Sequence, residues 1–106
     1  DYNMALKYYM LAANQNYAVA QYNIGWLYYN GYGVIQSFEE AVKWYSLAAE
    51  QNYAVAQYNL GWCYYKGHGV EKDYNKMIEY YRLSASQNYA VAQYNLGNCY
   101  YDGDAL

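Results

Sequence analysis

The residues with the greatest capacity for recognition chemistry are neutral and recur at a fixed spacing. Members of three sets lie 36 positions apart: Tyr22, Tyr58 and Tyr94; Asn23, Asn59 and Asn95; Trp26 and Trp62. An asparagine amide carries donors and an acceptor, so it can pair with a peptide backbone whatever the partner's sequence. Tyrosine and tryptophan give large contact areas at low cost in conformational entropy. These side chains therefore predict binding of an extended peptide or of a partner protein.

The predicted partner-binding residues share one helix face in each copy of the repeating unit, because they follow one another at spacings of three and four. They are Tyr22, Asn23, Trp26 and Tyr29; Tyr58, Asn59, Trp62 and Tyr65; and Tyr94, Asn95 and Asn98. Residues 17–29 and 53–65 contain no charged side chain. Two alternatives stay open: the asparagines tie neighbouring units together while the tyrosines fill the seam, or the face binds a neutral glycan.

Catalytic chemistry is not predicted. His68 is the single histidine and lies in a Gly-His-Gly segment, at a position held by Tyr32 and Asp104 in the other units. This variation predicts an exposed loop tip. The segment follows a helix and lacks the Lys-Ser/Thr of a phosphate-binding loop. Two thiols and one histidine do not make a metal site of usual geometry, so we expect no catalytic residue, no cofactor and no metal.

Charge and cysteine usage restrict the partners further. The formal net charge is −3, without a basic cluster, which argues against nucleic acid because such binding requires neutralising phosphates. No apolar run approaches the ~18 residues of a membrane span. Cys63 and Cys99 occupy equivalent positions on helices about 8–10 Å apart, too far for a disulfide, so both are predicted free. Free thiols favour a reducing compartment such as the cytoplasm, and the compartment is otherwise undetermined.

The elements that position these side chains come from an internal repeat. The string Gln-Asn-Tyr-Ala-Val-Ala-Gln-Tyr-Asn begins at Gln15, Gln51 and Gln87, which gives a 36-residue period. A fixed period of this length is typical of a solenoid, in which one supersecondary unit stacks on copies of itself.

Each unit is predicted to be a helical hairpin without a strand. Residues 18–30 have helical spacing of small and apolar residues, and Gly31 follows as a left-handed helix end. Ser37 and Glu40 form a capping-box pattern that starts a second helix over residues 38–50. Asn52 is the expected left-handed residue after that helix.

The chain is predicted to be a single solenoid fragment over residues 1–106. It divides into the second helix of a leading repeat at 1–16, full repeats at 17–52 and 53–88, and the first helix of a trailing repeat at 89–106. Neither end shows the polar capping helix that closes such arrays, so we expect the chain to be part of a larger chain or complex.

The residue pattern of one unit resembles that of a known family. Its residues are Ala20, Ile24, Gly25, Tyr28, Gly31, Gly33, Val34, Ala41, Trp44, Tyr45, Ala48 and Ala49. This pattern resembles the Sel-one-like repeat, a relative of the tetratricopeptide repeat. Asn16, Asn52 and Asn88 stand where the family often has glycine, and Ile35 and Glu71 replace a common proline.

The resemblance implies an all-α fold, a right-handed α-solenoid of antiparallel helix hairpins whose first helices line the inner curve. It also implies a non-enzymatic adaptor scaffold for protein–protein interaction. The alternative function is a structural or assembly subunit that uses the same surfaces for self-packing or lateral packing within a larger complex.

Mid-helix glycines mark the expected contacts inside the hairpins. Gly25 and its equivalents each cost roughly 1 kcal/mol relative to alanine, so we expect them to permit close helix approach. Tyr28 lies three residues after Gly25 and is expected to pack over it. Trp44 and Tyr45 are expected to be wedged between hairpins.

Overall fold

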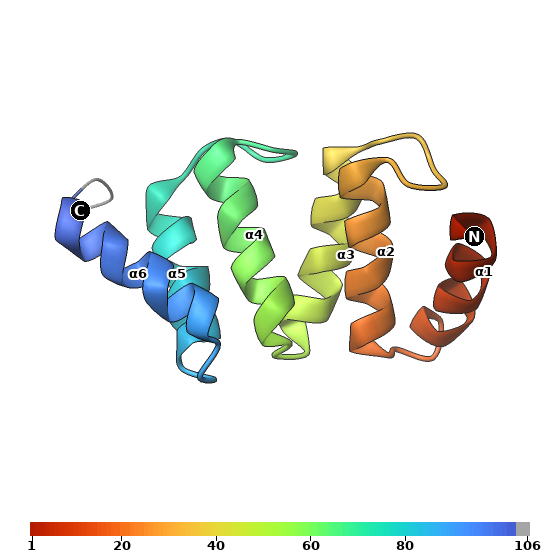
Figure 1. Cartoon of the computed structure of the whole chain (residues 1–106), viewed down its shortest axis with the longest axis horizontal. Helices are drawn as coiled ribbons and strands as arrows, with labels where there is room; N and C mark the ends of the chain where they lie inside the picture. The colour runs from red at the N-terminus through yellow and green to blue at the C-terminus, as the bar shows by residue number, and fades with distance from the viewer. Residues whose placement is uncertain (104–106) are drawn as a thin grey trace.

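The computed structural model describes residues 1–103, which form six α-helices and no strand. The helices are α1 (Tyr2–Ala13), α2 (Ala18–Asn30), α3 (Phe38–Glu50), α4 (Ala54–Lys66), α5 (Tyr74–Ala85) and α6 (Ala90–Asp102). They stack in chain order into an elongated body of 43 × 25 × 19 Å (Figure 1). The predicted helices over 18–30 and 38–50 are confirmed as α2 and α3.

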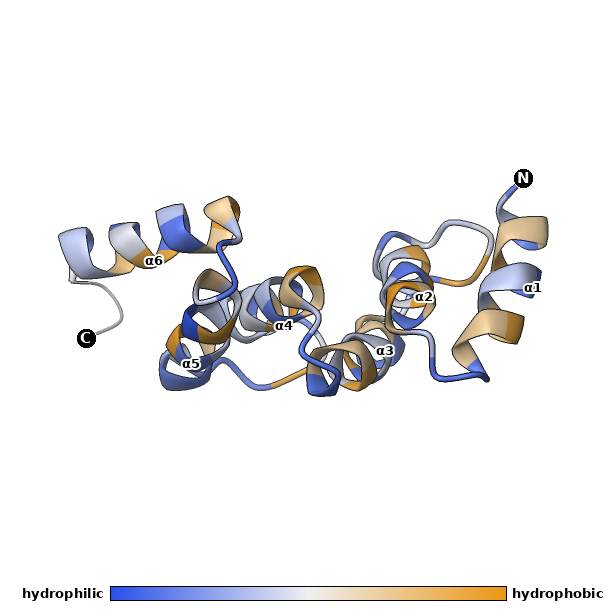
Figure 2. Cartoon of the chain, turned by 90° about the horizontal axis from the view of Figure 1, so that it is seen from below, coloured by the Kyte–Doolittle hydropathy of each residue, from blue (hydrophilic) through white to orange (hydrophobic). Residues whose placement is uncertain are grey.

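The helices form two rows. α2 pairs with α3 and α4 with α5 as antiparallel hairpins, and α3 and α5 contact the first helix of the next unit. Figure 2 shows the chain curving upward at both ends, with α2, α4 and α6 on the inner side and α3 and α5 on the outer side. α1 packs on α2, and α3 packs on α4.

The local sequence sets the helix ends as expected. Gly31 ends α2 with a φ of 71°, a left-handed conformation that glycine adopts without strain. Asn52 takes the same region with a φ of 65° after α3. The Ser37 hydroxyl accepts a hydrogen bond from the Glu40 backbone N–H at 3.1 Å and so caps the start of α3.

Close approach within each hairpin depends on a helical glycine, as predicted. A Cβ placed on Gly25 would lie 2.7 Å from Cδ1 of Tyr45, on the facing helix α3. The atoms nearest to this site therefore belong to Tyr45, and the expected packing of Tyr28 over Gly25 stays a prediction. Tyr45 is 1% exposed and Ala41, one turn earlier on α3, is fully buried. The missing side chain at Gly25 therefore leaves room for the Tyr45 ring between α2 and α3.

A ladder of side-chain amides holds successive repeats in register. Gln51 donates to the Gln21 amide oxygen at 2.9 Å and to the Asn16 amide oxygen at 3.2 Å. Gln21 is 3% exposed and itself donates to Asn16 at 3.2 Å. The same arrangement recurs one repeat later among Asn52, Gln57 and Gln87. The identical string found in the sequence therefore has a structural basis, because buried amides must be hydrogen-bonded.

Replacing Gly61 with alanine tests the close approach. Alanine normally stabilises a helix interior by about 1 kcal/mol relative to glycine. At Gly61 the new Cβ would lie 2.7 Å from Cδ1 of Tyr81 and 3.2 Å from the Met77 carbonyl oxygen. We therefore expect Gly61→Ala to lower the free energy of unfolding by roughly 1–3 kcal/mol, measured by urea denaturation of dilute protein followed by circular dichroism.

The matched control is Gly97→Ala, at the equivalent position of α6. Apart from its chain neighbours and the backbone of its own helix, no heavy atom of the described residues lies within 4 Å of its Cβ site. This variant should gain up to about 1 kcal/mol from helix propensity alone. Equal effects of the two substitutions would contradict the packing described.

Candidate functional site

Within residues 1–103, three cavities lie along the inner row, one beside each first helix. Their volumes are about 310 Å³ beside α1 and α2, about 270 Å³ between α2 and α4, and about 510 Å³ between α4 and α6. We call them the first, second and third cavity. Residues 36 positions apart fill equivalent places in them: the tyrosines Tyr9, Tyr45 and Tyr81, the asparagines Asn23, Asn59 and Asn95, and the tryptophans Trp26 and Trp62.

Tyrosines of the outer helices line the bottom of the second and third cavities. Tyr45 is 1% and Tyr81 is 2% exposed. Tyr45 stacks on Tyr22 with ring centroids 5.5 Å apart, and Tyr81 stacks on Tyr58 at 5.1 Å. Burial raises the pKa of both buried hydroxyls well above the usual tyrosine value. The cavity floor is therefore neutral, aromatic and fixed by packing.

Two asparagines tie neighbouring repeats together, as one of the alternatives predicted. The Asn59 amide donates to the Tyr22 hydroxyl at 3.1 Å, and the Asn95 amide donates to the Tyr58 hydroxyl at 3.2 Å. Asn59 also forms a side-chain hydrogen bond with Tyr45 on the cavity floor. The side-chain oxygen of Asn95 accepts no hydrogen bond from the described residues and remains available to a donor placed in the third cavity.

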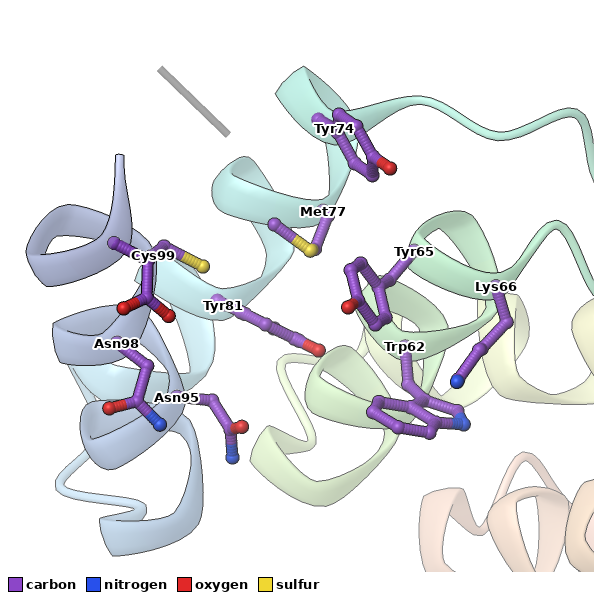
Figure 3. Close-up of a pocket in the computed structure, with 10 residues that line it drawn as sticks. Trp62, Tyr65, Lys66, Tyr74, Met77, Tyr81, Asn95, Asn98 and Cys99 are labelled. Carbon is purple, nitrogen blue, oxygen red and sulfur yellow. The ribbon is translucent and has the colours of Figure 1, made fainter. Parts of the chain in front are cut away.

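The tryptophans form the walls between cavities. Trp26 is 41% exposed and separates the first cavity from the second. Trp62 is half-buried, and the Lys66 ammonium lies 5.0 Å from its ring centroid, within cation–π range. Asn98 occupies the equivalent position in α6. The third cavity therefore has a tryptophan on one side only (Figure 3).

His68 departs from its predicted position at an exposed loop tip. It is half-buried, its ring stacks on Phe38 with centroids 4.2 Å apart, and its Nδ1 lies 2.7 Å from the Tyr29 hydroxyl. Tyr32 makes the equivalent stack on Tyr2 at 5.0 Å. The residue at this loop position therefore packs against the start of the preceding repeat's second helix. The prediction that His68 lies at an exposed loop tip is wrong.

The structure gathers nine of the eleven predicted binding residues around the cavities: Asn23, Trp26, Tyr29, Tyr58, Asn59, Trp62, Tyr65, Asn95 and Asn98. Tyr22 packs into the seam under Asn59, and Tyr94 is 70% exposed on α6. The floor tyrosines were not among the predicted binding residues, because Tyr45 was expected to be wedged between hairpins. Their recurrence at the same period as the asparagines was the signal that could have identified them.

The two cysteines lie at equivalent positions of successive repeats and differ in burial. Cys63 is fully buried and Cys99 is half-buried, and neither forms a disulfide, as predicted. Burial raises the pKa of the Cys63 thiol to about 12. Within residues 1–103, no group of three or more His, Cys, Asp or Glu side chains could hold a metal ion.

None of the described helices combines the length and apolar character needed to cross a bilayer.

Comparison with known proteins adds a family and two similar structures. The Sel1 repeat family model matches residues 1–17, 18–53, 54–89 and 90–106. A protective antigen of uropathogenic Escherichia coli with an SLR fold is 38% identical, with a TM-score of 0.96 over 100% of this chain and 23% of its own. A Sel1 repeat protein from Oxalobacter formigenes is 36% identical, with a TM-score of 0.90 over 98% of this chain and 43% of its own. No curated protein matched in a sequence search.

Replacing Tyr22 with phenylalanine tests the tie between repeats. The variant keeps the stacked ring and removes the hydroxyl that accepts from Asn59. We expect the free energy of unfolding to fall by about 1 kcal/mol in urea denaturation. Tyr94→Phe is the matched control, because this equivalent hydroxyl has no hydrogen-bond partner among the described residues, and its effect should be negligible. An equal effect at both positions would count against the tie.

Alkaline pH should destabilise the fold. Burial raises the pKa of Cys63 from 9.0 to about 12 and raises the pKa of Tyr45 and Tyr81 above the ordinary value of 10.0. Between pH 9 and 12 the unfolded chain loses protons that the folded chain keeps. The free energy of unfolding therefore falls with rising pH, by about 1.4 kcal/mol per pH unit for the cysteine alone.

Urea denaturation across this pH range measures the slope. Cys63→Leu is the matched variant, because Leu27 fills the equivalent buried position of the first full repeat. It should remove the cysteine's share of the slope and leave that of the tyrosines. A pH-independent stability up to pH 12 would contradict the burial of these groups.

Proposed function

The chain belongs to the Sel1 repeat family, and we propose that its inner face binds an extended peptide segment of a partner protein. Members of the family generally serve as scaffolds for protein–protein interaction, and the fold is typically non-catalytic. The proposal adds the location of the binding surface and the form of the ligand.

The observation that carries this proposal is the recurrence of a cavity along the inner row, with a tyrosine and an asparagine at equivalent places in each of the three. An extended peptide presents its side chains at regular intervals, so it suits a row of equivalent cavities. Solenoids characteristically use such long curved surfaces for binding. A small ligand would need one enclosed cavity, whereas these three adjoin one another through shared walls at Trp26 and Trp62.

The polar groups favour backbone recognition. Asn23 and Asn98 line the first and third cavities, and their amides make no hydrogen bond with the described residues. Their donors and acceptors match the carbonyl and N–H groups of a peptide main chain. The Asn95 oxygen adds a further acceptor in the third cavity. A protein partner also agrees with the net charge of −3, which opposes binding to phosphate backbones.

The aromatic residues divide into two roles under this proposal. Trp26, Trp62 and Tyr65 present their rings to the ligand, because each retains exposed surface at a cavity edge. Tyr22 and Tyr58 hold the walls in place through their bonds with Asn59 and Asn95. Tryptophans in such positions dominate binding energy at protein interfaces.

A double substitution at the tryptophans tests the proposal. A peptide is first selected from a displayed library of unstructured sequences against the immobilised chain, and its affinity is then measured by calorimetry. Trp26→Ala with Trp62→Ala should weaken binding at least about thirtyfold, the effect of losing about 2 kcal/mol. Helicity should be retained, since Trp26 is 41% exposed.

The matched control is Leu47→Ala with Leu83→Ala. These two apolar residues are also 36 positions apart and 37% and 43% exposed, and they lie on the outer helices. Their replacement should leave the affinity unchanged. Equal losses in both double variants would refute binding at the inner face, and displacement of the peptide by free sugars would favour the glycan alternative.

A further inference from the structure

Positive charges in this chain lie next to aromatic rings. Of its six lysine and arginine residues, four have their charged group 5.0–5.8 Å from the centroid of a tyrosine or tryptophan ring: Lys7, Lys66, Lys76 and Arg82. A cation within about 6 Å of a ring centroid is attracted by the negative face of the ring. The fold therefore stabilises positive charge at its aromatic surfaces.

Lys66 shows how such a contact is built on a first helix of the repeat. Its ammonium lies 5.0 Å from the Trp62 ring centroid and 5.4 Å from that of Tyr65 (Figure 3). Trp62 and Lys66 are four residues apart, so they are neighbours on the surface of α4. The helix thus supplies both the rings and the cation that they attract.

The equivalent place on α2 has the rings without the cation. Trp26 and Tyr29 lie 36 positions before the two aromatic residues of α4, and Asn30 replaces the lysine. The Asn30 amide donates to the Trp26 carbonyl oxygen at 2.9 Å, while its side-chain oxygen accepts no hydrogen bond from the described residues. Within residues 1–103, no lysine or arginine lies over Trp26 or Tyr29. The place that a lysine fills on α4 is therefore open, on α2, to a cation from a ligand.

Further aromatic residues surround this place in the second cavity. A space of about 270 Å³ is lined by Trp26 and Tyr29 of α2, Tyr45 of α3, and Tyr58 and Trp62 of α4. Burial raises the pKa of all three tyrosines, so their hydroxyls stay neutral. The other two lining residues are asparagines, so no formal charge borders the cavity. Several rings around one uncharged cavity form an aromatic cage, an arrangement that recognises ammonium groups.

The cage has features that favour an ammonium over an apolar group. Asn30 lines the cavity and has an unused acceptor oxygen, and an ammonium carries three donors whereas an apolar group carries none. Trp26 is 41% exposed, so a cation at its ring keeps part of its water. The net charge of −3 also attracts a positively charged group.

We propose that the second cavity binds the ammonium group of a lysine side chain. This ammonium lies against the Trp26 ring, as Lys66 lies against the Trp62 ring, and donates a hydrogen bond to the Asn30 side-chain oxygen. The inference rests on the proposed function, since the lysine belongs to the peptide bound along the inner face. It adds a residue preference at one cavity, and it makes Asn30 the residue that determines this preference.

Replacing lysine with norleucine in the peptide measures the preference. Norleucine keeps the four side-chain carbons of lysine and lacks the ammonium. Peptides selected from the displayed library should share a lysine, and norleucine at this position should weaken binding to the unmodified chain about fivefold or more in calorimetry. A fivefold change corresponds to about 1 kcal/mol, the size of a cation–π contact at a partly exposed site.

The substitution Asn30→Lys copies the residue that α4 carries at this position. The new ammonium should lie over the Trp26 ring and exclude the ammonium of the peptide, so this variant should bind the lysine and norleucine peptides equally. Asn30→Gln is the matched control, because it changes the same side chain and stays neutral. It should keep the preference for lysine.

Two small compounds test the cavity without a peptide. Nα-acetyl-lysine N-methylamide and its norleucine counterpart are titrated against the chain, and the indole N–H resonances are followed by NMR. The lysine compound should shift the Trp26 resonance more than the norleucine compound does. Asn30→Lys should remove this difference, and Asn30→Gln should keep it. Trp44 on α3 does not line the cavity and serves as the internal reference.

Equal binding of the two peptides by the unmodified chain would overturn the proposal, as would a lysine preference that Asn30→Lys leaves intact. Equal shifts of the Trp26 resonance by the two compounds would also overturn it. A peptide that binds the inner face without a preference for lysine would uphold the proposed function and refute the cage. A lysine compound that shifts Trp26 in a chain that binds no peptide would uphold the cage and refute the proposed function, so the two can fail separately.

Discussion

Each hairpin depends on a tyrosine ring that occupies the place of a side chain missing from the facing helix. The ring of Tyr45 reaches within van der Waals distance of Gly25, and Tyr81 does the same at Gly61. A glycine inside a helix is unfavourable by roughly 1 kcal/mol relative to alanine. The close contact of a large aromatic ring offsets this cost through burial of apolar area. The same ring then forms the floor of a cavity, so one contact determines both the packing of the hairpin and the shape of its binding surface.

Two sets of hydrogen bonds transmit this geometry from one repeat to the next. On one side the amide ladder through Gln21 and Gln51 joins helix ends. On the inner side Asn59 reaches Tyr22. Both sets use neutral groups, so their bonds do not require the desolvation of charge. A solenoid is stabilised mainly by contacts between neighbours, and these bonds fix the rotation between repeats. The spacing of the cavities follows from them.

Much of the fold could be predicted from the sequence because helix boundaries are local. Gly31, Ser37 and Asn52 act through their own backbone and nearest neighbours, and their roles were identified before the structure. Contacts between repeats could be predicted less well from the sequence. The period shows that Tyr29 and His68 belong to adjacent units, but it does not show that a loop reaches across to the preceding helix. The place of Tyr45 on a cavity floor was not predicted for a similar reason, since a residue can be 1% exposed and still border a cavity.

Differences between the repeats matter as much as their identity. The residues that build the hairpins and the ladder are nearly invariant within the chain, whereas the cavity edges vary: Trp26 and Trp62 give way to Asn98, and Asn30 gives way to Lys66 and Asp102. Variation at these positions leaves the packing intact, because the side chains project from the inner row rather than into the hairpins. A scaffold of this kind can therefore change what each cavity accepts without changing its fold. The third cavity, which has charged residues at its edge and the largest volume, differs most from the others in the side chain it could accommodate.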